Sequence, residues 1–273
     1  MSEHDAPAPD AAIEFPAPRI PEPTGTCPEL VSGNLIFAPA GMPPRRVRIE
    51  LSPEPIAAGP LILYWHATGS FTFEPAYALG DTIGAITDAG GVIAAPHSDP
   101  TAGIFEWFLV NQSPKLDDFL IADEIVACLV QAQRIDARRI HSMGFSAGAL
   151  QTTAMSYLRA SYIASVATYS GGVPPQFMPV ISEPANKLAA MIFHGGPGDV
   201  TRGVDFQSAS VTYEAMLDAA GHFTLMCDHG KGHAIPRDAA PSITAFFEAH
   251  PFGAWPSPYE DGLPGAFPMY CVP

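Results

Sequence analysis

The sequence predicts an α/β fold in which a mostly parallel central sheet carries helices on both of its faces. Short apolar runs of strand length alternate along the chain with stretches of helical length, and a repeated order of strand and helix is typical of parallel sheets. The chain has 273 residues, of which 47% are hydrophobic and only 15% are charged. A chain of this size and composition can bury a substantial core in one domain.

The elements follow from the apolar periodicity. Strands are predicted at residues 35–37, 46–51, 61–66, 91–95, 139–143, 164–169, 190–193 and 222–227. Helices are predicted at residues 75–89, 117–134, 147–160, 205–220 and 241–250. In the helix at 117–134, apolar residues recur at three- and four-residue spacing, so one face should pack on the sheet. We expect Asp117 and Asp118 to accept hydrogen bonds from its first free N–H groups.

Proline marks the limits of the predicted domain. The chain has 30 prolines, with seven in the first 28 residues and six in the last 23, and proline is excluded from helix interiors and central strands. We therefore expect an extended segment at residues 1–29, one globular domain at residues 30–250 and a C-terminal strap at residues 251–273.

The charge balance excludes some classes of partner. Lys and Arg number 13 against 28 Asp and Glu, which gives a formal net charge of −15. Proteins that track nucleic-acid phosphates or adhere to anionic lipid need clustered basic side chains, so both functions are set aside. The longest apolar helical stretch is interrupted by Asp123 and Glu124 and falls short of the roughly 20 residues that a bilayer requires.

The four cysteines leave the redox state open. Cys128 falls on the apolar side of a predicted helix, where we expect a buried free thiol. Cys27 and Cys271 lie in the two proline-rich tails, and we hypothesise a bridge between them or from Cys271 to Cys227. Such a bridge favours an oxidising compartment. The expected location is therefore extracellular or periplasmic, although the chain starts with no secretory signal pattern and the cytoplasm stays an open alternative.

The most informative passage is the motif formed by Gly144, Ser146 and Gly148, each separated by one residue. It lies between the predicted strand at 139–143 and the helix at 147–160. In that context a sharp turn projects the serine hydroxyl above the sheet, tolerates only small neighbours and points the next N–H at the reacting group. Ser146 is therefore predicted to be a nucleophile, with the N–H of Ala147 beside it.

Over residues 45–250 the chain resembles the α/β-hydrolase superfamily, and within it the group of polyhydroxybutyrate depolymerases and feruloyl esterases. The resemblance depends on the serine motif and on further segments that the family shares. These are residues 61–66, Trp107-Phe108 with Asp117-Asp118, residues 135–140, and Gly232-His233-Ala234-Ile235-Pro236.

The resemblance implies the partners of the serine, because the superfamily has the chain order serine, acid, histidine. Asp199, in the loop after the strand at 190–193, takes the place of the acid, with Asp205 as the reserve candidate. His233 follows the last predicted strand and takes the place of the general base, with His229 as the alternative.

The resemblance also implies an oxyanion hole built from the N–H groups of Thr68 and Ala147, with the Thr68 hydroxyl as a further donor. A plain turn of small residues at Thr68 is the alternative. Trp107 lies near the place where the family forms its acyl pocket, so it lines that pocket or belongs to the core.

These expectations lead to a serine esterase that cleaves carboxylic esters through an acyl-enzyme, with no metal and no organic cofactor. The expected partner is a small or polymeric ester, and we expect the chain to be a monomer. Two alternatives stay open. One is an esterase directed at a polymer, either a polyester or the feruloyl or acetyl groups of a polysaccharide. The other is a catalytically silent hydrolase fold that serves as a binding module.

Overall fold

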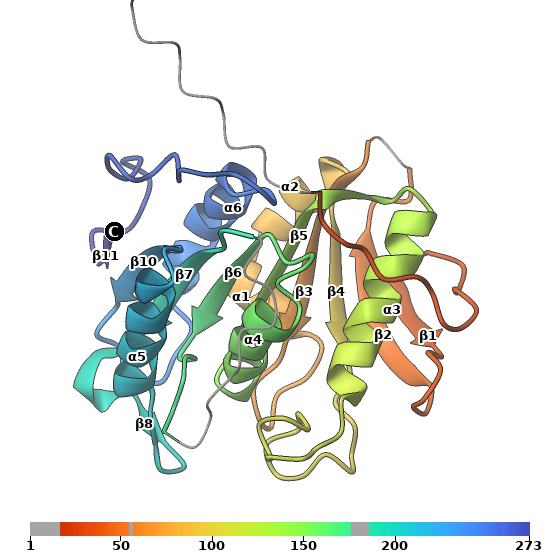
Figure 1. Ribbon diagram of the computed structural model, residues 1–273, viewed down its shortest axis with the longest axis horizontal. Helices are drawn as coiled ribbons and strands as arrows, with labels where there is room; N and C mark the ends of the chain where they lie inside the picture. Colours follow the sequence, from red (N-terminus) through yellow and green to blue (C-terminus); the bar gives the residue numbers. More distant parts are fainter. Residues whose placement is uncertain (1–16, 55–56, 176–185) are drawn as a thin grey trace, which may run out of the picture.

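The fold is built on one central sheet (Figure 1). The computed structural model describes residues 17–54, 57–175 and 186–273. Within these residues nine strands are joined in the order β1-β2-β4-β3-β5-β6-β7-β10-β11. Their bounds are β1 Gly33–Phe37, β2 Arg45–Leu51, β3 Gly59–Trp65, β4 Val92–Pro96, β5 Ile135–Phe145, β6 Ser165–Tyr169, β7 Ala189–His194, β10 Phe223–Asp228 and β11 Cys271–Val272.

The six strands in the middle of this order, β4, β3, β5, β6, β7 and β10, run parallel to one another. Strands β1, β2 and β11 are antiparallel to the strands beside them. The predicted fold class is therefore confirmed, and each of the eight predicted strands overlaps an observed one. The missed strands are β8 Val200–Thr201, β9 Val204–Asp205 and β11. Each has only two residues, which is too short to show a periodic pattern.

Helices cover both faces of the sheet. They are α1 Glu74–Leu79, α2 Thr82–Asp88, α3 Asp117–Gln131, α4 Ala147–Leu158, α5 Phe206–Ala219 and α6 Ala240–Ala249. Strand β3 is buried along its whole length, and its side chains alternate between two core clusters. Leu61, Leu63 and Trp65 pack with residues of α3, α4 and α5. Ile62 and Tyr64 pack with residues of α1, α2 and α6. The period of two places one hydrophobic core on each side of the sheet.

Two expectations about the helices are wrong in detail. The stretch at 75–89 forms two helices, because the chain turns at Gly80 with a φ of 53°. Asp117 and Asp118 do not cap α3 through their side chains. Asp118 is buried, and its carboxylate instead pairs with Arg45 and accepts the Phe108 N–H at 2.7 Å. It thereby attaches the loop before α3 to β2.

The described part of the N-terminal segment, residues 17–29, contains neither helix nor strand. Glu124 of α3 accepts hydrogen bonds from the N–H and hydroxyl of Thr24 at 2.8 and 2.9 Å and from the Gly25 N–H at 2.9 Å. One helical turn further on, Cys128 forms a disulfide with Cys27. The expected free thiol at Cys128 is therefore wrong, because the N-terminal segment packs along this side of α3.

The C-terminal segment returns to the sheet. Cys271 in β11 lies opposite Cys227 in β10, and the two form a disulfide. This confirms the bridge from Cys271 to Cys227, and the alternative bridge between Cys27 and Cys271 is wrong. Tyr259 and Phe267 of the same segment pack against the core on the α6 side. In the described part of the chain, no helix has the length and apolar character needed to cross a membrane.

Candidate active site

Ser146 lies in the sharp turn between β5 and α4. Its φ of 55° and ψ of −119° lie outside the ordinary helical and strand regions. The turn brings the backbone close to the end of β3, since a Cβ on Gly148 would lie 1.9 Å from the carbonyl oxygen of Trp65. This close approach requires glycine, which explains the motif in physical terms. The exposed fraction of Ser146 is 8%, so the hydroxyl is sheltered at the floor of the site.

The three residues expected to act together are in hydrogen-bond contact. Nε2 of His233 lies 2.9 Å from Oγ of Ser146, and Nδ1 of His233 lies 2.7 Å from Oδ1 of Asp199. Ser146 follows β5, Asp199 follows β7 and His233 follows β10. These are the carboxyl ends of parallel strands, which lie at one edge of the sheet (Figure 1). This is the geometry of a serine activated by a histidine that an acid orients.

The alternative candidates for the acid and the base, Asp205 and His229, lie outside this hydrogen-bonded series. Asp205 is exposed and caps α5 by accepting the N–H and hydroxyl hydrogens of Ser208 at 3.0 and 2.8 Å. His229 accepts the Lys231 N–H through its Nδ1 and packs beside Tyr270. In the described part of the chain, neither forms a hydrogen bond or an ion pair with Ser146 or His233.

The carboxylate of Asp199 is fully buried and held on both oxygens. Besides its contact with His233, it accepts hydrogen bonds from the Ser170 hydroxyl at 2.8 Å and the Gly195 N–H at 2.9 Å. Burial raises the pKa of Asp199, but the hydrogen bonds from His233, Gly195 and Ser170 outweigh it, so the net pKa is lowered. Asp199 is therefore ionised near neutral pH and can accept a hydrogen bond from the N–H at Nδ1 of His233.

Two phenylalanines hold the imidazole in place. The ring of His233 packs against those of Phe145 and Phe206, with centroid distances of 4.7 Å to each. Phe145 ends β5 and Phe206 begins α5. Neither residue was predicted from the sequence, because nothing in a local pattern shows which aromatic rings the fold brings to a loop histidine.

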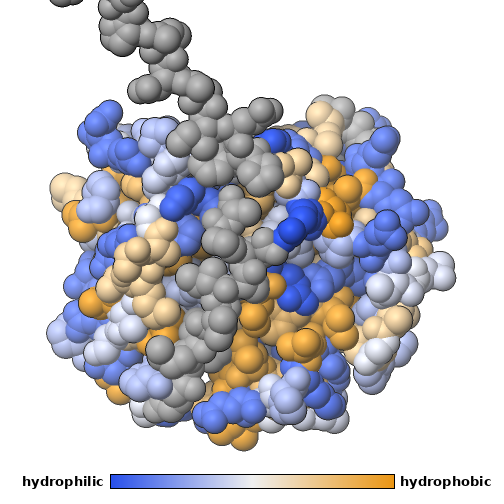
Figure 2. Space-filling model, viewed as in Figure 1, coloured by the Kyte–Doolittle hydropathy of each residue, from blue (hydrophilic) through white to orange (hydrophobic). Residues whose placement is uncertain are grey.

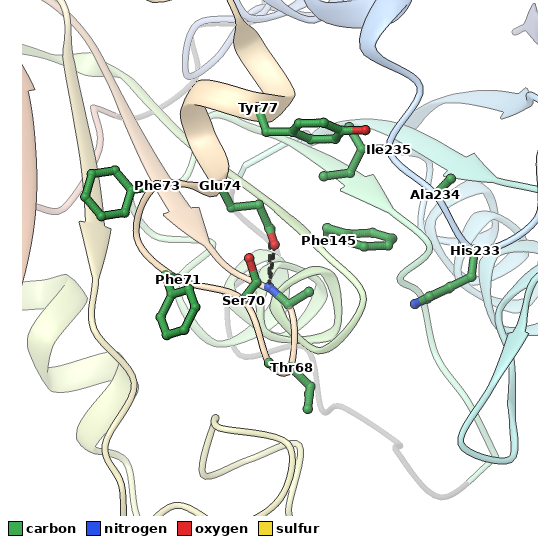
Figure 3. Close-up of a pocket in the computed structure, with 12 residues that line it drawn as sticks. Thr68, Ser70, Phe71, Phe73, Glu74, Tyr77, Phe145, His233, Ala234 and Ile235 are labelled. Carbon is green, nitrogen blue, oxygen red and sulfur yellow. Dashed lines mark hydrogen bonds between the residues drawn. The ribbon is translucent and has the colours of Figure 1, made fainter.

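The loop at residues 66–70 follows β3, and its Thr68 and Ser70 line the same pocket as His233 (Figure 3). Ala67 donates its N–H to the carboxylate of Glu74 at 3.1 and 3.2 Å, and Gly69 donates its N–H to Oε1 of Glu106 at 3.1 Å. Between them, the N–H of Thr68 has no acceptor in the described part of the chain, and its buried hydroxyl is likewise unpartnered there. Thr68 therefore offers free donors, as expected for an oxyanion hole.

The second expected donor is the N–H of Ala147. Ala147 is the first residue of α4, where N–H groups have no acceptor within the helix and where the helix dipole favours negative charge. Thr68 and Ala147 both line the pocket that contains Ser146. The structure thus brings the two predicted donors to the nucleophile.

Two pockets meet at the histidine, and both are lined by Ala67, Thr68, Phe145 and His233. The smaller has a volume of about 280 Å³ and contains Ser146, with apolar walls from Phe105, Leu150, Val204 and Phe206. The larger, of about 590 Å³, is lined by Phe71, Phe73, Tyr77 and Ile235 and by the carboxylate of Glu74 (Figure 3). Hydrophobic surface is visible along the lower edge of the molecule in Figure 2, where loops after the parallel strands lie.

Trp107 lines neither of these pockets, so its expected place in the substrate pocket is wrong. Its exposed fraction is 0%, its indole N–H donates to the carbonyl oxygen of His66 at 3.0 Å, and its ring packs edge-on against Trp65. It belongs to the core and supports the start of the 66–70 loop. Phe105, two residues earlier, lines the smaller pocket instead.

Glu74 and Glu106 were not foreseen from the sequence. Burial raises the pKa of Glu74, although hydrogen bonds from Ser70, Ala67 and Tyr64 lower it in part. Glu106 also lies 3.3 Å from Nδ1 of His66. Each of the two accepts a hydrogen bond from a backbone N–H of the 66–70 loop, and such a group carries no sequence signature. As for metals, the described residues contain no group of three or more His, Cys, Asp or Glu side chains that could hold an ion.

Comparison with solved structures shows similar folds. The native structure of a protein designated pOPH matches 90% of this chain and 96% of its own, with a TM-score of 0.71 and 16% identity. A thermostable esterase matches 80% of this chain and 62% of its own, with a TM-score of 0.63 and 15% identity. The acylaminoacyl peptidase of Pyrococcus horikoshii matches 85% of this chain and 43% of its own, with a TM-score of 0.58 and 15% identity.

These likenesses and the sheet order show that the chain has the α/β-hydrolase fold. No family model and no curated protein sequence matches the chain, so membership of the polyhydroxybutyrate depolymerase and feruloyl esterase group stays a prediction.

Proposed function

We propose that this protein is a serine hydrolase that cleaves carboxylic esters through an acyl-enzyme. The observation that carries the proposal is the hydrogen-bonded series from Ser146 Oγ through the imidazole of His233 to the carboxylate of Asp199. This series brings together side chains from three separate chain segments. It lies beside the N–H donors of Thr68 and Ala147 and at the meeting point of the two pockets.

The first half of the reaction forms the acyl-enzyme. His233 takes the proton of the Ser146 hydroxyl as Oγ attacks the ester carbonyl, and Asp199 stabilises the imidazolium that results. The N–H groups of Thr68 and Ala147 donate to the oxyanion of the tetrahedral intermediate. His233 then gives its proton to the alcohol oxygen as the C–O bond breaks.

In the second half, His233 takes a proton from a water molecule that attacks the acyl-enzyme. The same two N–H groups stabilise the second intermediate, and His233 returns a proton to Ser146 Oγ as the acid leaves. The serine proton thus leaves with the alcohol, and a proton from water restores the serine hydroxyl.

The thermostable esterase among the similar structures supports the proposal that the substrate is an ester. Because an acylaminoacyl peptidase is also among them, the hydrolysis of an amide should be measured alongside that of the ester. A substrate with an extended or polymeric alcohol side is a second candidate. It is supported by the exposed rings of Phe71 and Phe73 at the larger pocket, whose exposed fractions are 72% and 63%. A silent binding module would not need an assembled triad.

The test uses p-nitrophenyl esters, with a p-nitroanilide as the amide comparison. Ser146→Ala should lower ester hydrolysis by roughly 10⁴-fold or more, because it removes the nucleophile. The matched control is Ser161→Ala, which lies outside both pockets. A fluorophosphonate probe should label the native protein and not the Ser146 variant. A Ser146 variant that retains most of its activity would refute the proposal.

A further inference from the structure

The two pockets divide a bound ester into its acyl side and its alcohol side. The larger pocket continues along Ala234 and Ile235, which follow His233, whereas the smaller one continues along Ser146, Ala147 and Leu150. His233 lines both pockets, whereas Ser146, to which the acyl group becomes bonded, lines only the smaller one. The acyl side accordingly occupies the smaller pocket.

The smaller pocket carries one permanent charge among its lining residues, that of Arg202. Arg202 is exposed, and it forms no ion pair or hydrogen bond with any residue in the described ranges. The same pocket has apolar walls from Phe105, Leu150 and Val204, and its lining residues include no Asp or Glu. A guanidinium that faces a pocket without a carboxylate partner is free to bind an anionic group of a ligand.

The backbone conformation of Arg202 is also unusual for a residue with a long side chain. Arg202 and Gly203 form the two-residue turn between β8 and β9, with φ values of 52° and 80°. Positive φ at both positions favours Asn, Asp or Gly at the first and disfavours a long side chain. The hairpin is tied to the catalytic acid segment, because the Phe206 N–H donates to the carbonyl oxygen of Asp199 at 2.9 Å.

We propose that Arg202 is a specificity-determining residue that binds an anionic group at the far end of the acyl chain. The substrate class is then esters in which the acid carries a second carboxylate, such as monoesters of short dicarboxylic acids. This inference rests on the proposed ester hydrolysis. A pocket that combines the nucleophile, apolar walls and one guanidinium matches an acyl chain of methylenes that carries a negative charge.

The experiment compares the p-nitrophenyl monoester of glutaric acid with p-nitrophenyl hexanoate, which has no charge. The quantity measured is the ratio of their kcat/KM values. Arg202→Gln should lower this ratio by roughly tenfold, Arg202→Lys by less, and 1 M NaCl should lower the native ratio as well. Arg46→Gln, an exposed arginine outside both pockets, is the matched control and should leave the ratio unchanged.

An Arg202→Gln variant with the native ratio would overturn the inference, as would an equal loss on both esters. In 4-acetoxybenzoate the carboxylate is on the alcohol side of the ester. If Arg202→Gln lowers only the hydrolysis of this compound, the assignment of the acyl side to the smaller pocket is wrong. Failure of the native protein to hydrolyse the hexanoate ester would count against the proposed function itself. The two failures are thus distinguishable.

A second inference depends on the loop at residues 66–70. Of three consecutive N–H groups, those of Ala67 and Gly69 are taken by Glu74 and Glu106, and only that of Thr68 lacks an acceptor in the described chain. Glu74 has an exposed fraction of 8% and accepts the Tyr64 hydroxyl hydrogen at 3.0 Å, so it is fixed to β3. Both carboxylates come from segments that follow the loop in the chain, Glu74 from the start of α1 and Glu106 from the stretch between β4 and α3.

The geometry points to Glu74 and Glu106 as positioning residues that aim the Thr68 N–H at the oxyanion. Their negative charges would oppose an oxyanion nearby, so their contribution is the orientation of the loop rather than charge stabilisation. A neutral side chain with an acceptor oxygen should therefore preserve much of the effect, whereas an apolar one should not. This inference also rests on the proposed ester hydrolysis.

The test compares Glu74→Gln with Glu74→Leu, and Glu260→Gln at an exposed site serves as the control. Glu74→Leu should lower kcat by about 10- to 100-fold with a smaller change in KM, and Glu74→Gln should recover most of the loss. The distinguishing readout is the rate ratio between an ester and its thionoester, because a C=S sulfur is a poor hydrogen-bond acceptor. This ratio should fall in Glu74→Leu. A native ratio in that variant, with a native melting temperature, would refute the positioning role.

Discussion

The hydroxyl of Ser170 donates a hydrogen bond of 2.8 Å to Oδ2 of Asp199, on the carboxylate oxygen that does not face His233. Ser170 follows β6, is fully buried, and is itself held by its N–H, which donates to the carbonyl oxygen of Phe193. The orientation of the triad acid is thus determined by two neighbouring strands, β6 and β7.

Replacing Ser170 by alanine should therefore weaken the triad without removing it. A hydrogen bond to a charged group contributes about 1.5 to 3 kcal/mol, and part of this orients the carboxylate, so we expect kcat/KM to fall by roughly tenfold. The measurement is kcat/KM for ester hydrolysis by Ser170→Ala and by the native protein under the same conditions. Native activity in Ser170→Ala would show that the Gly195 N–H suffices to hold Asp199.

The two candidate acids can be separated by mutation. Asp199→Asn should lower kcat by about 10³- to 10⁴-fold, since the amide no longer favours the productive tautomer of His233. Asp205→Ala should remain active, because Asp205 caps α5 and does not contact the histidine. Its effect should instead be a loss of about 1 kcal/mol in the free energy of unfolding, measured with urea. The reverse pattern of activity would assign the acid to Asp205.

Stability should fall on mild acidification because of a buried histidine. Burial lowers the pKa of His250 to about 4, whereas an unfolded histidine titrates near 6.5. As the pH drops from 6.5 toward 4, the unfolded chain takes up a proton at this position and the folded chain does not. The free energy of unfolding should thus decrease, by on the order of 3 kcal/mol in total.

The test is the melting temperature of the native protein and of His250→Phe at pH 7 and pH 5. Phenylalanine keeps an aromatic ring beside Phe223 and Phe246 but cannot titrate. The decrease in melting temperature between the two pH values should be smaller in the variant. Equal decreases would assign the acid sensitivity to other groups, of which His222, with a pKa lowered by burial to about 4, is the first to examine.

Both disulfides should contribute to stability. They close loops with sequence separations of 101 and 44 residues, and loss of each should cost about 2 to 4 kcal/mol of unfolding free energy. Urea denaturation of Cys27→Ala/Cys128→Ala and Cys227→Ala/Cys271→Ala measures this. We propose an oxidising compartment for this protein. The protein isolated from such a compartment should gain no mass on alkylation without reductant, and four alkylated thiols would contradict the proposal.

The sequence was sufficient for features with a local signature. The eight longer strands have apolar runs, and Ser146 is marked by glycines that the turn at Gly148 physically requires. Asp199 and His233 could be placed because the resemblance to the α/β-hydrolase superfamily implies the chain order serine, acid, histidine and hence the strand ends that they follow.

Other features depend on contacts between distant segments. The pairing of Cys27 with Cys128 requires the path of the N-terminal segment over α3, which apolar periodicity does not encode. The core position of Trp107 depends on Trp65 and His66. The role of Glu74 depends on a backbone N–H, and any residue type could have supplied that group.

The pairing of β11 with β10 also bears on how copies of this chain can associate. A sheet edge offers unpaired N–H and C=O groups to any neighbouring strand and is a common route to aggregation. Here Met226 and Cys227 of β10 are already paired with β11, and the disulfide to Cys271 prevents that short strand from dissociating. Reduction of this single bond would uncover the edge next to the segment that leads to His233, so a reducing storage buffer should promote aggregation before it affects the chemistry of Ser146.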